Sequence, residues 1–551
     1  MITSSNFYTF PPPAHKWEAA DEALKNAVES YLQSCLHLES SYLPVPKADK
    51  MPMSLVTRID ASLDILTTTL GRQLSRCHSS LARTRNRIAS PIYNLPEEIL
   101  AEISLNVVYM PAKARSKSLA DTIHIMYRSL YNLIGVCSTW KNAIINCGAL
   151  WAVVPVLDPL TRNSLKTLIH PGTDLSLQRA GRWLQLAADL SGDSDYKLEF
   201  GALASNVQRF HSVHIHTKSN KTITSLIRTI LQSRSLAELS IFKRIKSGAQ
   251  LQDITDHEEL QIVNQQYTPP YTLASQPEFR TLMESITVLR LSGVLLPWDN
   301  IESIAQLQEL HFRGVQFRSG DAMLSFLHTL SSGSELRDLT ISSVSNWNEK
   351  ISPPPSHAFT LAKLQSLALE DLTFHTLKSL LQSINPASYR TTLSITQNTT
   401  PTRSMGSWDR AHYPDLCDLI RQIAVDTLII DITFYTPPPV LREILSSVPG
   451  LRVLRLNGWS LQRGDSEGLK RPEGHNQIPF PNLSELHLYN IVTWSADAAK
   501  AITKIQPIKR MVIGRDRGFD HYSLIELLKS VVPDVSLGDQ DESESCWGFS
   551  I

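Results

Sequence analysis

Three closely spaced histidines come nearest, in type and spacing, to residues that could bind a metal ion. They lie in HSVHIH, residues 211–216. Side chains two residues apart on a strand share one face, so His214 and His216 have a spacing that a metal can use. The strand frame gives its inward positions to apolar residues, namely Phe210, Val213 and Ile215. We therefore interpret the histidines as facing solvent or a partner, and we expect no metal site.

The cysteines offer no better candidate for a reactive or zinc-binding site. All six are far apart and form no C-x-x-C pair: Cys35, Cys77, Cys137, Cys147, Cys417 and Cys546. This spacing is typical of a reducing compartment rather than of a disulfide framework. Phosphate-binding, dinucleotide-binding, zinc-protease and nucleophile-elbow motifs are missing from the sequence. We expect a protein that is not an enzyme and uses no cofactor.

Composition narrows the class of partner. The chain has 551 residues, of which 42% are hydrophobic and 19% charged, and 53 basic residues balance 53 acidic ones. This length favours more than one structural unit, and a net charge near zero gives no reason to expect nucleic acid or a membrane as partner. No signal-peptide pattern or long apolar run is evident, so we expect the cytoplasm and/or the nucleus.

Two long helical patterns occupy the first ninety residues. Apolar residues recur at helical spacing in 15–40, prolines interrupt residues 41–53, and leucines follow a near-heptad spacing from Leu55 to Ile88. Arginines occupy the outer positions of the second helix. Two interpretations remain open: an antiparallel hairpin with a solvated basic face, or a homodimeric coiled coil through residues 54–89.

A repeated nine-residue template fills the second half of the chain. Apolar residues stand at positions one, four, six and nine, and a turn-forming residue stands at position eight. The six copies are ITVLRLSGV, LQELHFRGV, LRDLTISSV, LQSLALEDL, LRVLRLNGW and LSELHLYNI, which begin at Ile286, Leu307, Leu336, Leu364, Leu451 and Leu483. Their spacing and alternation are typical of leucine-rich repeats, in which short parallel strands stack into a solenoid.

The repeat frame also separates core positions from surface positions. Positions four and six point inward, and positions five and seven point outward. On the outward face, arginine and tyrosine are the residue types that most often dominate binding energy. We therefore select Arg290, Arg313, Arg455 and Tyr489 as candidate contacts to a substrate protein. Position nine is apolar where leucine-rich repeats usually have Asn or Cys, so apolar packing must hold these turns.

A short, well-defined helix is predicted in NLPEEILAEISLNVV, residues 94–108. Asn94 can cap the helix while Glu97 reaches back, and Pro96 lies in the first turn. The segments VCSTWK, residues 136–141, and Leu150-Trp151 follow in order. Together they resemble the F-box motif as it occurs in fungal proteins, over about 60 residues.

The resemblance implies a three-helix domain that binds the Skp adaptor, and through it a cullin, while the following domain recruits a substrate. By position in the motif, the adaptor-binding residues would be Leu95, Pro96, Ile99, Leu100, Ile103, Val136, Cys137, Trp140 and Trp151. The last four would form the domain core and the remainder of the contact. Residues 110–127 form an insertion, which we expect to leave as a basic surface loop.

The expected fold class is α/β: N-terminal helices and a three-helix F-box, followed by an irregular leucine-rich-repeat-like solenoid. The expected boundaries are 1–53 for a helix and proline-rich linker, 54–90 for the second helix, 91–155 for the F-box, 156–205 for a connection, 206–535 for the solenoid and 536–551 for an acidic tail. The function expected from the resemblance is substrate recognition in a Skp–cullin–F-box ubiquitin ligase. The alternative is an interaction scaffold unrelated to ubiquitination.

Overall fold

The computed structural model contains two compact units, residues Met1–Asn94 and Leu95–Ile551. The residues that the structure describes are 12–42, 53–89, 91–109, 118–157, 171–190, 201–231, 233–243, 277–294, 304–317, 320–331, 335–346, 358–385, 388–396, 399, 413–431, 438–458, 460–461, 482–491, 493–494, 496–497, 508–514 and 521–538. The candidate F-box residues and much of the repeat array are therefore described, whereas Trp459 and residues 539–551 lie outside these ranges.

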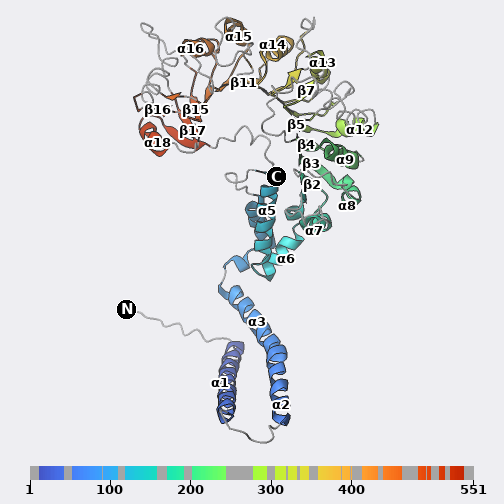
Figure 1. Ribbon diagram of the computed structural model, residues 1–551, viewed down its shortest axis with the longest axis vertical. Helices are drawn as coiled ribbons and strands as arrows, with labels where there is room; N and C mark the ends of the chain where they lie inside the picture. Colours follow the sequence, from blue (N-terminus) through green and yellow to red (C-terminus); the bar gives the residue numbers. More distant parts are fainter. Residues whose placement is uncertain are drawn as a thin grey trace. The chain divides into compact units, whose positions relative to one another are not determined.

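The first unit is a helical hairpin. Helix α1 (Pro12–Ser41) lies antiparallel to a second helical rod made of α2 (Met53–Asp64), the π-helical turn η1 (Ile65–Leu70) and α3 (Gly71–Ala89), as Figure 1 shows. The Tyr31 and Ser62 hydroxyls share a hydrogen bond of 2.7 Å between the two rods. Leu66, Leu70 and Leu74 follow one another at spacings of four residues along this rod. A 3-10 turn, η2 (Pro91–Asn94), ends the unit.

The second unit begins with three mutually packed helices: α4 (Glu97–Tyr109), α5 (Leu119–Ile134) and α6 (Ser138–Asn146), followed by the 3-10 turn η3 (Gly148–Trp151). Helix α5 contradicts the expected loop at 110–127. Ser118 caps it by accepting a hydrogen bond from the Asp121 N–H at 3.1 Å, and Leu119, Ile123 and Met126 are buried in the core. Residues 110–117 lie outside the described residues.

Fourteen strands of the described chain form one parallel sheet in sequence order. They are β1 (Val153–Leu157), β2 (Leu184–Leu190), β3 (Phe210–Thr217), β4 (Glu238–Lys243), β5 (Val288–Ser292), β6 (Glu309–Arg313), β8 (Asp338–Ser342), β10 (Ser366–Glu370), β11 (Arg390–Ile395), β12 (Thr427–Asp431), β13 (Val453–Asn457), β15 (Glu485–Tyr489), β17 (Arg510–Gly514) and β18 (Asp534–Gly538). Two short pairs accompany them: β7 (Gln316–Phe317) with β9 (Ser345–Asn346), and β14 (Ser460–Leu461) with β16 (Thr493–Trp494).

Helices connect successive strands and cover one face of the sheet (Figure 1). These are α7 (Pro171–Arg179), α8 (Gly201–Ala204), α9 (Asn220–Ile230), α12 (Pro277–Ser285), α13 (Gly320–Ser331), α14 (Phe374–Ser383), α15 (Tyr413–Ile420), α16 (Pro438–Ser446) and α18 (His521–Lys529), with the 3-10 turn η4 (Val207–Arg209) before β3. Parallel strands alternating with helices make a leucine-rich-repeat-like solenoid, as the repeat template predicts. Its first strand lies at Val153, however, well before the predicted start at 206, and its last ends at Gly538.

The turn position of the template has the backbone conformation that its residue types indicate. All six residues at position eight have positive φ: Gly293, Gly314, Ser343, Asp371, Gly458 and Asn490, at 50° to 72°. The N–H of Gly314 donates to the carbonyl of Ser342 at 2.9 Å, and that of Gly458 donates to Tyr489 at 2.9 Å. Backbone bonds between neighbouring repeats thus add to the apolar packing that the sequence predicts for these turns.

Candidate functional site

Helix α4 begins two residues later than the capping pattern predicts. The carbonyl of Pro96 accepts hydrogen bonds from the N–H groups of Ile99 and Leu100, both at 3.1 Å, so Pro96 rather than Asn94 occupies the capping position. Asn94 closes the preceding 3-10 turn. Glu97 and Glu98 occupy the first turn, where their charges favour the positive end of the helix dipole.

Helix α4 has an apolar buried face and an apolar exposed face. Leu100, Ser104 and Val108 are buried, with at most 6% of each residue exposed. On the other side, Ile99 is 47% exposed, Ile103 36% and Val107 48%. We call these last three residues the α4 stripe. Val107 was not among the predicted adaptor-binding residues. The sequence could have indicated it, because Ile99, Ile103 and Val107 follow one another at a regular spacing of four residues.

Leu100 differs from its predicted role. Only 1% of its surface is exposed, so it supports α4 from inside and cannot enter a groove on a partner. The physical reason is packing: α5 and α6 pack against the side of α4 that carries Leu100, Ser104 and Val108 and cover these residues. Leu95 is half-buried and Pro96 is exposed at the start of the helix.

The second part of the motif contains both core and surface residues. Val136, in the turn between α5 and α6, is 56% exposed and thus available to a partner. Trp151 is buried, and its Nε1–H donates to the carbonyl of Ile144 at 2.9 Å. Trp140 is half-buried and packs against the same core, and the half-buried Cys137 occupies the N-cap position of α6.

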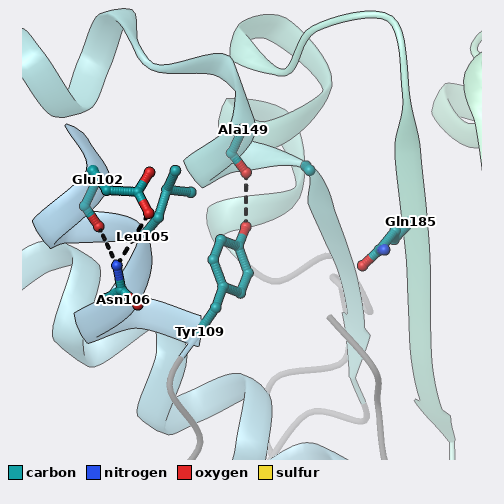
Figure 2. Close-up of a pocket in the computed structure, with 7 residues that line it drawn as sticks. Glu102, Leu105, Asn106, Tyr109, Ala149 and Gln185 are labelled. Carbon is teal, nitrogen blue, oxygen red and sulfur yellow. Dashed lines mark hydrogen bonds between the residues drawn. The ribbon is translucent and has the colours of Figure 1, made fainter. Parts of the chain in front are cut away.

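A shallow pocket of about 440 Å³ lies between α4, η3 and β2 (Figure 2). It is lined by Glu102, Leu105, Asn106, Tyr109, Ala149, Ala152 and Gln185. The Tyr109 hydroxyl donates to the carbonyl of Ala149 at 2.9 Å, and burial raises the pKa of this phenol, which keeps it a neutral donor. The motif could not reveal this pocket, because Gln185 comes from β2, outside the F-box-like segment.

The outward face of β3 to β6 carries a chain of paired charges. Arg290 pairs with Glu238 and, at 2.7 Å from its Nε, with Glu309. His214 lies 3.9 Å from Glu238, and His311 lies 3.1 Å from Glu309. The Arg290 side chain is only 12% exposed, so this predicted substrate contact is occupied by neighbouring carboxylates. The sequence feature that could have predicted this pairing is an acidic residue at position three of the repeat on each side of Arg290, namely Glu238 and Glu309.

Two of the other three candidate contacts share a neighbour on the outward face. Arg313 and Arg455 both act on Glu370, whose pKa is raised by burial and partly lowered again by the two guanidinium groups. Tyr489 is half-buried beside Gly514, where an added Cβ would come within 2.6 Å of the tyrosine ring. Arg313 and Arg455 therefore share one acidic neighbour, whereas Arg290 is paired with Glu238 and Glu309.

The prediction that the histidines of residues 211–216 face solvent or a partner is wrong for His214. It is only 5% exposed, and its pKa is lowered to about 3, first by burial and then by the nearby Arg290 and His216. Within the described residues, no group of three or more His, Cys, Asp or Glu side chains could hold a metal ion. In the same part of the chain, no helix is long and apolar enough to span a bilayer.

Comparisons with known proteins identify similar solved structures only. No protein-family model and no curated protein matches the sequence. The leucine-rich repeat-containing protein LegL7 from Legionella pneumophila is 12% identical, covers 71% of this chain and 91% of its own, and has a TM-score of 0.31. A chain in the structure of the Rad7 and Elc1 complex in yeast is 10% identical, covers 91% and 100%, and has a TM-score of 0.36. At these scores the strands and turns of the chain itself, rather than the comparisons, define the fold.

Proposed function

We propose that this chain is a substrate-recognition subunit of a Skp–cullin–F-box ubiquitin ligase. The observation that carries the proposal is the α4 stripe: Ile99, Ile103 and Val107 are apolar and 36–48% exposed on a helix that the F-box-like motif assigns to adaptor binding. Exposed apolar anchors are where interface energy concentrates. Val136, on the same three-helix unit, adds a fourth exposed apolar side chain.

The packing between the three helices and the solenoid supports a positioning role. Tyr127 donates from its hydroxyl to the Val153 carbonyl of β1 at 2.8 Å, and the Ala120 N–H donates to Asp189 of β2 at 3.1 Å. Trp151, Val153 and Ala187 share one hydrophobic core. A rigid joint of this kind would hold a substrate on the solenoid at a fixed place relative to the adaptor. In this proposal the chain positions its substrate in the cytoplasm or nucleus and catalyses no reaction itself.

The outward face of the sheet is the proposed substrate surface. The charges around Arg290 are already paired with one another, so we assign binding to the remainder of this face, around Arg313, Arg455 and Tyr489. Tyr489 combines an apolar ring with a hydroxyl, which suits a contact that must exclude water at one end. The substrate is a protein in this proposal, because a broad outward face of short strands offers extended contact rather than an enclosed small-molecule cavity.

The proposal is tested by co-purification with the Skp adaptor. Replacing Ile99 and Ile103 with Glu puts two charges on the α4 stripe, and we expect at least about tenfold weaker adaptor binding, because interface anchors commonly contribute more than 1 kcal/mol each. The buried face of α4 does not change, so the thermal transition should stay close to that of the wild type. Binding is measured by titration of purified proteins.

The matched control places the same charges far from the motif. Tyr522 in α18 is 77% exposed and Val531 is 40% exposed, so a double Glu variant there should bind the adaptor like the wild type. Full binding by the Ile99 and Ile103 variant would show that the α4 stripe is not the contact. A folded wild-type chain that never binds the adaptor would favour the scaffold alternative. In that alternative the three helices act as the N-terminal cap of the solenoid, a role that fits the core they share with β1.

A further inference from the structure

The helical hairpin leaves its apolar side chains uncovered. No side chain of α1, α2, η1 or α3, all of which are described, is buried. Exposed large apolar residues follow both rods at heptad-like spacing. They are Trp17, Leu24, Val28, Tyr31, Leu32, Leu36 and Leu38 on α1, and Met53, Val56, Ile59, Leu63, Ile65, Leu66, Leu70, Leu74, Leu81 and Ile88 on the second rod.

This surface is large enough for a stable protein interface. Exposed fractions run from 36% for Leu66 to 82% for Ile88. Seventeen side chains of this size and exposure offer on the order of 1,000 Å² per chain, comparable to the roughly 800 Å² that each partner of a standard interface buries. Isolated helices gain too little from backbone hydrogen bonds alone to be stable, so a rod of this length needs an apolar partner surface.

The charges on the two rods indicate which partner covers them. Helix α1 has five acidic residues and two lysines, whereas the second rod has six arginines and two aspartates. One rod is thus acidic and the other basic. A second copy, related by a two-fold axis, brings α1 of each chain next to the basic rod of the other, so that every contact joins opposite charges.

We propose that the hairpins of two chains pair antiparallel into a four-helix bundle, which makes the protein a homodimer. The apolar seam lies at the centre, and the acidic and basic rods alternate around it. The Tyr31–Ser62 hydrogen bond fixes how the two rods of one chain are aligned, and places the acidic start of α1 level with Arg72 and Arg76. The proposal does not rest on the proposed ligase function.

Two charge-reversal variants of the full chain test the proposal. The basic variant replaces acidic residues of α1 with Lys: Glu18, Asp21 and Glu22. The acidic variant replaces arginines of the second rod with Glu: Arg72, Arg76 and Arg83. We expect the wild type to sediment at micromolar concentration with twice the 61.7 kDa mass of one chain. Each variant alone should sediment as a monomer, because all rods then carry the same sign.

An equimolar mixture of the two variants separates pairing between chains from pairing within one hairpin. Inside each variant the two rods still repel, so recovery of a dimer in the mixture requires contact between an all-basic hairpin and an all-acidic one. We expect that recovery, and we expect added salt to weaken it. A monomeric wild type, a mixture that stays monomeric, or a dimer that survives in each variant alone would overturn the proposal. Circular dichroism checks that each variant keeps its helices.

Discussion

At the scale of single residues, the outward face of β3 to β6 shows how neighbouring repeats determine each other's charge state. His214 is enclosed by Glu238, Arg290 and His216. Glu238 alone would favour a protonated imidazole, but its carboxylate is already paired with Arg290, whose positive charge opposes that protonation. Burial adds the larger effect in the same direction, so His214 is neutral in the folded chain at physiological pH.

This neutral histidine makes stability depend on pH. The pKa of His214 is about 3 in the folded chain against 6.5 for an ordinary histidine, so below pH 6.5 the unfolded chain binds more protons. Its contribution to stability is complete above pH 6.5 and is lost as the pH falls. At pH 5 the loss is about 2 kcal/mol. We expect His214→Gln to reduce, by about that amount, the decrease in unfolding free energy between pH 7.5 and 5, as measured by urea titration.

Replacement of His375, which is exposed, by Gln is the matched control for the substitution itself. Equal pH dependence in the wild type and His214→Gln would show that His214 does not titrate as described. The sequence could not predict this environment. Alternation along one strand places His214 outward, but its burial comes from Glu238 and Arg290, which join it only when β4 and β5 stack beside β3.

At the scale of elements, the repeat template predicted strands and turns because each depends on local residue types. Leu289, Leu291, Leu310 and Phe312 are at most 1% exposed at the predicted inward positions. Every residue at position eight has positive φ, a conformation that Gly, Asn and Asp tolerate more readily than other residues. The template therefore contained both the core and the backbone geometry of each repeat.

The turns differ in how they should respond to substitution. Gly458 has φ of 72° and Asn490 has φ of 50°. A Cβ in this region costs roughly 1–2 kcal/mol, so Gly458→Ala should lower the unfolding free energy by about that much. Asn490→Gly removes such a strain and loses an exposed hydrogen bond to Asn457, so it should change stability by less than about 0.5 kcal/mol. Urea unfolding measures both; equal effects would contradict a strained turn.

Helix α5 and strands β1 and β2 were not predicted, for two reasons. Residues 110–127 begin with basic residues, which obscured the helical spacing of Leu119, Ile123 and Leu130 farther along. Strands β1 and β2, VVPVL and LQLAADL, are buried on nearly every side chain. Continuous apolar strands of this kind show no alternation, so periodicity could not distinguish them from a connecting segment.

At the scale of the whole molecule, the sequence predicted the order of parts better than their boundaries. Helices, a three-helix segment and a solenoid occur as expected, because each has its own periodicity. The boundary at 155 has no structural counterpart, since Trp151, Val153 and Ala187 belong to one core that joins the helices to the sheet. Packing between distant segments defines that core, and periodicity within a segment does not report it.

The division between the two units predicts how the chain responds to removal of its hairpin. Both hydrophobic clusters begin at or after Val108, and no side chain of α1 to α3 is buried. A chain that begins at Pro91 therefore keeps its whole core, and its thermal midpoint should stay within about 3 °C of the full-length value, the shift that about 1 kcal/mol produces in a large domain. Calorimetry measures this midpoint. A larger drop in the thermal midpoint would mean that the solenoid depends on the hairpin for stability. It would also mean that the apolar residues of the hairpin are already covered by the rest of the same chain.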